Sequence, residues 1–182
     1  MKREFVPERL NVADFAQAGA HLSGSQPLAQ FERLAAEAVE PVQGKMVEWT
    51  ASGEQRQDAG GRVEPWMHLA ASTVLPLTCQ RCLAPVQTPI EVDRWFRFTA
   101  DEETAAALDE ELEEDVLVAS HDFDLLGLIE DELLMELPIT PRHEVCPQEV
   151  PLSAQDPDFD SADTERANPF AALAKLRSDK SE

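Results

Sequence analysis

Residues 69–98 read LAASTVLPLTCQRCLAPVQTPIEVDRWFRF, and polar and apolar side chains alternate on both sides of the central C-x-x-C motif. A period of two is typical of β-strands that bury one face. One face before the motif carries Leu69, Ala71, Thr73, Leu75, Leu77 and Cys79. One face after it carries Val86, Thr88, Ile90, Val92, Arg94, Phe96 and Phe98. The pattern predicts two antiparallel strands that meet where the chain reverses, at residues 79–82.

The preceding segment continues this pattern. From Val42 onward the period is again two, with Val47, Trp49 and Ala51 on one face. A turn segment, residues 57–61, separates it from the next strand. Three strands joined by short turns predict an antiparallel β-meander or a partly open barrel.

The N-terminal part carries weaker signals. Residues 1–28 are polar and rich in turn formers, so we expect irregular structure with a short edge strand at Phe5, Val6 and Leu10. Residues 29–39 place apolar side chains at helical spacing, which predicts a short amphipathic helix that Pro41 ends.

Residues 101–136 are strongly acidic, with 15 Asp or Glu and no Lys or Arg. We expect an exposed helix or loop over residues 101–114, then a short strand at residues 116–118. Asp122 or Asp124 can cap an amphipathic helix over residues 125–137, because acids suit a helix N-terminus and Pro138 stops the helix. This acidic helix should pack its leucines on the meander, which gives an α+β fold.

Three regions follow from these patterns. Residues 1–146 form a single α+β domain. Residues 147–167 are an acidic linker rich in Asp, Pro and Ser, which we expect to be flexible. Residues 168–182 form a short C-terminal helix and tail, since Asn168 and Pro169 are a strong helix start.

The composition narrows the class of function. The chain has 182 residues and a net charge of −21, which repels nucleic acid and anionic membranes and favours basic partners. No secretory signal and no membrane-spanning run is evident, so we expect a cytoplasmic protein without a membrane partner. Phosphate-binding and nucleophile motifs are absent, so we expect neither an enzyme nor a small-molecule substrate.

The cysteines suggest a metal site. Cys79 and Cys82 form a C-x-x-C, and His143 and Cys146 form an H-x-x-C with the same spacing. Together they make a Cys3His set, which is typical of one structural zinc. Two alternatives remain open: the cysteines are small buried apolar residues, or the C-x-x-C is a redox motif. The redox alternative is weaker, because a strand rather than a helix follows the motif.

A second candidate site is basic and aromatic. Arg81, Arg94, Trp95 and Arg97 are tentative contacts for RNA or another partner. Alternatively, these arginines pair with the acidic block, which the net charge favours. The run of three acids at residues 130–132 is interpreted as a solvated helix face.

Four ordered blocks carry a resemblance to a known family. They are C-Q-R-C-L-A-P-V from Cys79, the acidic helix from Asp122 that ends in L-P, the P-R-H-E-V-C segment that ends at Cys146, and N-P-F-A-A-L-A-K-L from Asn168. Over about residues 42–176 the chain resembles the bacterial large ribosomal RNA subunit accumulation protein family, YceD.

The resemblance implies a non-enzymatic role in the synthesis, processing or stability of 23S ribosomal RNA during large-subunit assembly. The implied partner is large-subunit ribosomal RNA or its precursor. Because the chain is acidic, we also expect that it binds a basic ribosomal protein, with the RNA or in its place. The matching positions here are Cys79, Arg81, Cys82, Glu130, Leu137, Pro138, His143 and Cys146. A different class of function is also kept open, an acidic and zinc-stabilised interaction module with a partner outside the ribosome.

Overall fold

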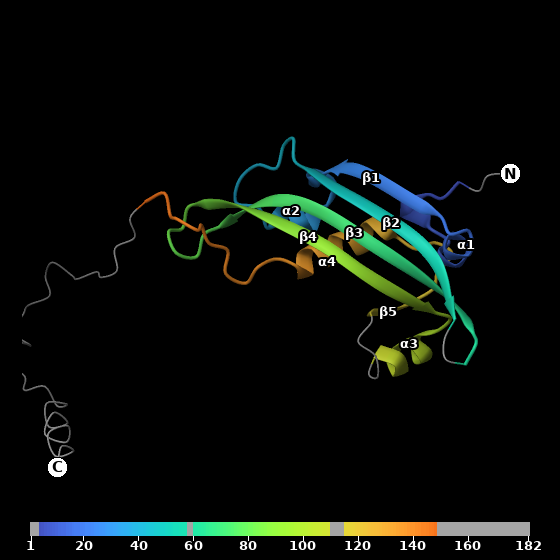
Figure 1. Cartoon of the computed structure of the whole chain (residues 1–182). Helices are drawn as coiled ribbons and strands as arrows, with labels where there is room; N and C mark the ends of the chain where they lie inside the picture. Colours follow the sequence, from blue (N-terminus) through green and yellow to red (C-terminus); the bar gives the residue numbers. More distant parts are fainter. Residues whose placement is uncertain (1–3, 58–59, 110–114, 149–182) are drawn as a thin grey trace, which may run out of the picture. The chain divides into compact units, whose positions relative to one another are not determined.

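The structure, a computed structural model, describes residues 4–57, 60–109 and 115–148 (Figure 1). The predicted C-terminal helix and almost all of the predicted acidic linker lie outside the described residues, so both remain predictions.

The centre of the fold is a five-stranded mixed sheet with strand order β1-β2-β3-β4-β5. Strands β2 (Met46–Gln57), β3 (Val63–Thr78) and β4 (Pro85–Thr99) form the predicted antiparallel meander. β1 (His21–Pro27) pairs antiparallel with β2, and β5 (Asp115–Val118) pairs parallel with β4. The sheet is therefore open, with β1 and β5 at its edges, and the predicted α+β class is confirmed.

Helices precede the first strand, connect β1 to β2 and β4 to β5, and follow the last strand. They are η1 (Pro7–Arg9), α1 (Val12–Gln17), η2 (Leu28–Gln30), α2 (Glu32–Ala36), α3 (Glu102–Asp109) and α4 (Leu125–Met135). Figure 1 shows α2 and α4 behind the sheet, and α1 and α4 contact its central strands. None of the helices in the described ranges is long and apolar enough to cross a membrane.

The core lies between the helices and the face of the sheet that carries the predicted apolar positions. Val47, Leu69 and Phe96 are completely buried on that face. Gly53 lies there too, and a Cβ atom on it would lie 2.7 Å from the ring of Phe15 and 2.9 Å from the backbone of Ala16. Since no side chain fits in that space, glycine lets α1 pack directly on β2.

Helix α4 confirms the acidic amphipathic helix. The Asp124 carboxylate caps it by accepting a hydrogen bond from the backbone N–H of Gly127 at 2.9 Å. Leu125, Ile129 and Leu133, four residues apart, are completely buried, as expected for one face of a helix. The predicted strand at residues 116–118 is also present, as β5.

The N-terminal prediction is partly wrong. Residues 12–17 and 21–27 are regular, and the expected edge strand at Phe5, Val6 and Leu10 is replaced by the short helix η1, with a single bridge between Leu10 and Phe123. Proline at the start of η1 favours helical backbone there. β1 forms despite its serines and glycine because it pairs along its whole length with β2, so tertiary pairing overrides local propensity.

Candidate metal centre

The structure brings Cys79, Cys82, His143 and Cys146 together. Their candidate ligand atoms all lie within 4.8 Å of one another, and within the described residues no other cluster of cysteine, histidine and acidic side chains has metal-binding geometry. The Sγ atoms of Cys79 and Cys146 are 4.0 Å apart, and Cys82 Sγ is 3.5 Å from His143 Nδ1. We call these four residues the clasp, because they join the β3–β4 turn to the segment that follows α4.

The β3–β4 turn presents the first two sulfurs. The backbone N–H of Cys79 donates to the carbonyl of Ala84 at 3.0 Å, and the N–H of Leu83 donates back to the carbonyl of Cys79 at 2.8 Å. These bonds close the turn tightly and place Leu83 in the left-handed region, with φ of 61°. A non-glycine residue held there costs about 1–3 kcal/mol, which marks the turn as constrained by its surroundings.

The second arm is held to this turn by hydrogen bonds. The backbone N–H of Gln80 donates to the carbonyl of Pro141 at 2.8 Å. Arg81 donates from Nε to Cys146 Sγ at 3.0 Å and from Nη2 to the carbonyl of His143 at 2.8 Å. The exposed guanidinium of Arg81 is thus engaged within the chain, next to the sulfurs, where its charge favours a thiolate.

The histidine has the ring orientation that a metal ligand needs. His143 Nε2 lies 3.1 Å from the carbonyl oxygen of Pro85. A carbonyl only accepts, so Nε2 donates to it, and in the neutral imidazole this leaves Nδ1, which faces Cys82, without a proton. Fixing the tautomer through the second nitrogen is the usual arrangement for metal-binding histidines.

The thiols differ in acidity. Burial raises the pKa of Cys79, but the backbone N–H groups of Cys82, His143 and Arg81 outweigh it and lower that pKa to about 5. The backbone N–H of Ala84 lowers the pKa of Cys82, yet burial and the neighbouring sulfurs of Cys146 and Cys79 leave it raised. Three sulfurs in so small a volume repel one another when ionised, and one divalent cation would relieve that repulsion.

These features fit a site for a tetrahedrally coordinated ion better than a redox site. Four ligands at about 2.3 Å from one Zn²⁺ are about 3.8 Å apart, close to the 4.0 Å and 3.5 Å separations found here. A reactive cysteine is partly exposed, often at a helix N-terminus, whereas Cys79 is completely buried in a turn between strands. The low pKa of Cys79 suits a ligand that must be deprotonated to bind metal.

The other predicted site residues do not gather in one place. Arg94 lies on the face of β4 that packs on the helices, where it pairs with Glu136 at 2.7 Å, Asp115 at 3.4 Å and Glu132 at 3.5 Å. These carboxylates belong to the acidic block, as the alternative interpretation expected.

Trp95 and Arg97 lie on the opposite, open face. Arg97 pairs with Glu64 at 2.6 Å, and the Trp95 ring stacks with His68 at a centroid distance of 4.7 Å. Arg56 lies between the rings of Trp66 and Trp95, at 4.3 Å and 3.9 Å from their centroids. Arg81 is far from this group, because Trp95 is ten residues along β4 from the turn, or about 33 Å.

The acidic run at residues 130–132 has partners that sequence patterns did not indicate. Glu130 Oε1 accepts from the backbone N–H groups of Arg33 and Leu34 at 2.8 Å and 3.2 Å, and so caps the start of α2. Asp131 pairs with the Arg33 side chain at 2.6 Å. The interpretation as a solvated face is wrong for Glu130 and Glu132, whose side chains are 13% and 8% exposed. Arg33 lies nearly a hundred residues away in the sequence, so only the fold shows the pairing.

Comparison with known proteins agrees with the resemblance in the sequence. The family model described as "Large ribosomal RNA subunit accumulation protein YceD" matches residues 67–177, a span that contains the whole clasp. A Haemophilus influenzae protein with the same description is 36% identical over 104 residues, covering 56% of this chain and 59% of the relative. The chain thus matches less than two thirds of that relative's length, and no solved structure matches it. The chain belongs to the YceD family of large ribosomal RNA subunit accumulation proteins.

Proposed function

We propose that this chain supports the accumulation of 23S ribosomal RNA in the cytoplasm, as a non-enzymatic factor in the synthesis, processing or stability of that RNA during large-subunit assembly. The family match over residues 67–177 carries the proposal. The clasp adds to it, because four protein ligands fill a tetrahedral coordination sphere and leave no open position for catalysis.

The clasp is, in this proposal, a structural zinc centre. Cys79 and Cys82 hold the ion from the β3–β4 turn, and His143 and Cys146 hold it from the segment after α4. The donors fit the ion in type, spacing and tautomer. The ion would supply a fixed join between two parts of the chain, and Arg81 would stabilise the thiolates beside it.

The net charge of the chain indicates the class of its partner. A net charge of −21 opposes unassisted binding to phosphates, so we propose a basic ribosomal protein as the direct partner and large-subunit RNA as the wider target. Arg81 is the exposed arginine at the clasp and remains our candidate for an RNA contact. Arg94 and Arg97 are held by carboxylates, so we assign them to the stability of the fold.

Removing the gene tests the function. We expect a lower ratio of 23S to 16S ribosomal RNA in the deletion strain, measured on total RNA, and restoration by the wild-type gene. Cys79→Ser should restore it poorly, whereas the exposed Glu37→Gln should restore it fully. A 23S level that does not change on deletion, together with an affinity-tagged full chain that recovers only non-ribosomal partners, would contradict the proposal and favour the non-ribosomal interaction module.

A further inference from the structure

Among the residues that the structure describes, α1 and α4 pack on one face of the sheet and leave the other face open. Helices α1 and α4 lie on the core side, where Gly53 closely approaches α1 and where the leucines of α4 are buried. The alternate residues of these strands point the other way, and Glu48, Ser72 and Glu91 are exposed there. This open face runs along the middle of β2, β3 and β4, and it does not include the clasp.

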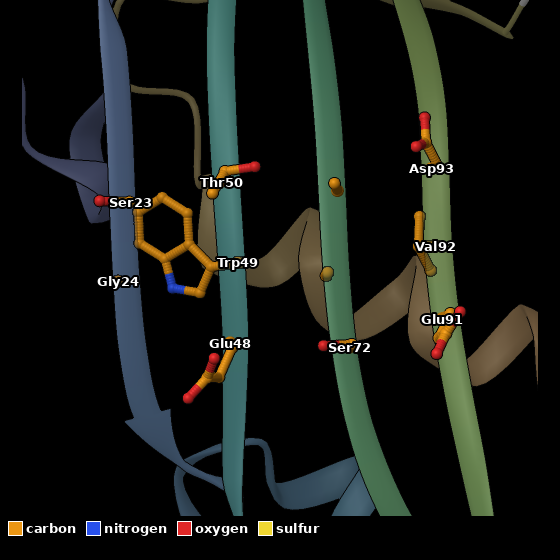
Figure 2. A pocket seen from close by; sticks show the side chains of 11 residues that line it. Ser23, Gly24, Glu48, Trp49, Thr50, Ser72, Glu91, Val92 and Asp93 are labelled. Atoms are coloured by element: carbon orange, nitrogen blue, oxygen red, sulfur yellow. The ribbon is translucent and has the colours of Figure 1, made fainter.

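The open face is hollowed along β3. A hollow of about 600 Å³ adjoins a second of about 380 Å³, and both are lined by Glu48, Ser72 and Glu91. We call this the trough. Its floor is β3, where Ala70 and Ser72 have small side chains, and its walls are Glu48 and Thr50 of β2 and Glu91 and Asp93 of β4. The larger hollow also extends beyond β2 to Ser23 and Gly24 of β1. Figure 2 shows these walls on either side of the strand that carries Ser72.

The walls are acidic and partly unpaired. Glu48, Ser72 and Glu91 are directly opposite one another across the three strands. Within the described part of the chain, neither Glu48 nor Glu91 makes a hydrogen bond or an ion pair, while Asp93 contacts His68 at 2.7 Å. Lys45 also lines the second hollow, where it donates to Gln87 at 2.7 Å. The carboxylates of Glu48, Glu91 and Asp93 outnumber this one cation, and such an excess attracts a positively charged occupant.

The spacing of the acidic side chains favours one shape of occupant. Glu48 of β2 and Glu91 of β4 lie on either side of β3, on strands that are two spacings or about 10 Å apart. One extended chain that lies along β3 reaches both, and its side chains on one face recur about every 6.6 Å, the same spacing that separates Glu91 from Asp93.

We propose that the trough is the docking surface for an extended protein segment with lysine or arginine at alternate positions. The proposal rests on the proposed function only for the identity of the partner, a basic ribosomal protein. The surface itself is assigned from its charge, its small-residue floor and the spacing of its carboxylates.

A labelled peptide tests the surface directly. The probe is a fluorescein-labelled twelve-residue peptide in which lysine and threonine alternate, titrated with the full chain at low ionic strength and followed by anisotropy. Glu48→Gln with Glu91→Gln should weaken binding about tenfold, since exposed ion pairs contribute about 0.2–1 kcal/mol each. Ser72→Phe, which fills the floor without changing charge, should weaken binding by a similar factor, and melting curves should show that both proteins are folded.

The matched control is Glu8→Gln with Glu37→Gln, which makes the same change in net charge at exposed positions outside the trough. It should weaken binding less than about twofold. Equal losses in the two double variants would overturn the proposal, because the field of the whole molecule would then account for binding. Unchanged binding by Ser72→Phe, or tighter binding of an alanine–lysine helical peptide of equal charge, would also overturn it.

The outcomes separate this inference from the proposed function. Trough variants that lose affinity for a labelled single-stranded RNA instead of the peptide would overturn the peptide assignment and leave the 23S measurement standing. If deletion of the gene leaves 23S unchanged while the trough variants still lose the peptide, the proposed function is wrong. The docking surface then stands with a basic partner outside the ribosome.

Discussion

At the scale of one residue, Arg94 shows how the fold accommodates a buried carboxylate. Its guanidinium lies between β4 and α4 and is paired with three carboxylates of the acidic block. One of them, Glu132, is buried, and its Oε2 atom has no hydrogen-bond partner among the described residues. Arg94 is therefore the charge that makes burial of Glu132 tolerable.

Removing Arg94 should destabilise the fold. In Arg94→Ala, Glu132 keeps its burial but loses its nearest cation, and breaking a fully buried pair costs about 3–5 kcal/mol. Because Arg94 is about one-third exposed, we expect a smaller loss of about 2 kcal/mol in the free energy of unfolding, measured by urea titration. The control is Arg9→Ala, whose pair with Asp122 is exposed and should cost less than about 1 kcal/mol. Equal effects of the two substitutions would contradict this role.

Glu132 should make stability depend on pH. Burial raises its pKa, Arg94 opposes the rise, and the carboxylates of Asp115, Glu136 and Asp131 add to it. A raised pKa in the folded state means that the contribution to stability is full below the ordinary glutamate pKa of about 4.3 and is lost as the pH rises through the raised value. The Glu132→Gln variant has no carboxyl group at this position, so its stability does not fall in this way as the pH rises.

The measurement compares the two proteins across that range. The free energy of unfolding of Glu132→Gln relative to the wild type should become more favourable between about pH 4 and pH 7. The exposed Glu37→Gln should show no such trend. A difference that is constant, or that falls as the pH rises, would count against a raised pKa at Glu132.

At the scale of elements, α4 connects the parts of the fold. It packs its leucines on the sheet, caps α2 through Glu130 and holds β4 through Arg94. The segment that follows it carries the second arm of the clasp. The position where α4 starts therefore affects both the core and the clasp.

The cap of α4 can be tested alone. Asp124→Ala removes the acceptor for the Gly127 N–H, and we expect a loss of about 1 kcal/mol in the free energy of unfolding. Asp124→Asn keeps an oxygen at the same position and should lose much less. If both substitutions cost the same, the charge of Asp124 rather than its hydrogen bond would be what stabilises the helix.

The elements that could be predicted from sequence are those whose signal is local. The alternation of polar and apolar residues predicted β2, β3 and β4, and an aspartate followed by leucines at helical spacing predicted α4. β1 was missed because its serines and glycine favour no strand, and it depends on pairing with β2. α1 was missed because six residues carry too few repeats of a helical period.

The residues of the candidate site were also predictable only where their sequence signal is local. The spacing of C-x-x-C and H-x-x-C indicated the four clasp residues, which the fold brings within 4.8 Å. Sequence proximity wrongly suggested that Arg94 and Arg97 act on one surface, although strand alternation puts them on opposite faces. The cap that Glu130 gives to α2 joins segments far apart in sequence, so no local pattern could indicate it.

At the scale of the whole molecule, the described residues form an open sheet with three distinct regions. One face is buried under helices, the other carries the acidic trough, and the clasp lies at the end where β3 turns into β4. The net charge of −21 makes a basic partner the natural one for the trough. In the proposed function the clasp has a structural task, to fix the segment after α4 to the sheet.

The zinc content of the full chain is the most direct measurement of that task. Protein purified without chelator should contain about one zinc per chain by elemental analysis, because all four ligands belong to one chain. Cys79→Ser should lose the zinc and melt at a lower temperature, and the wild type treated with a chelator should melt like the variant. Zinc-free wild-type protein that cannot be loaded, and whose melting does not change with zinc or chelator, would contradict the account and leave the clasp cysteines as packing residues.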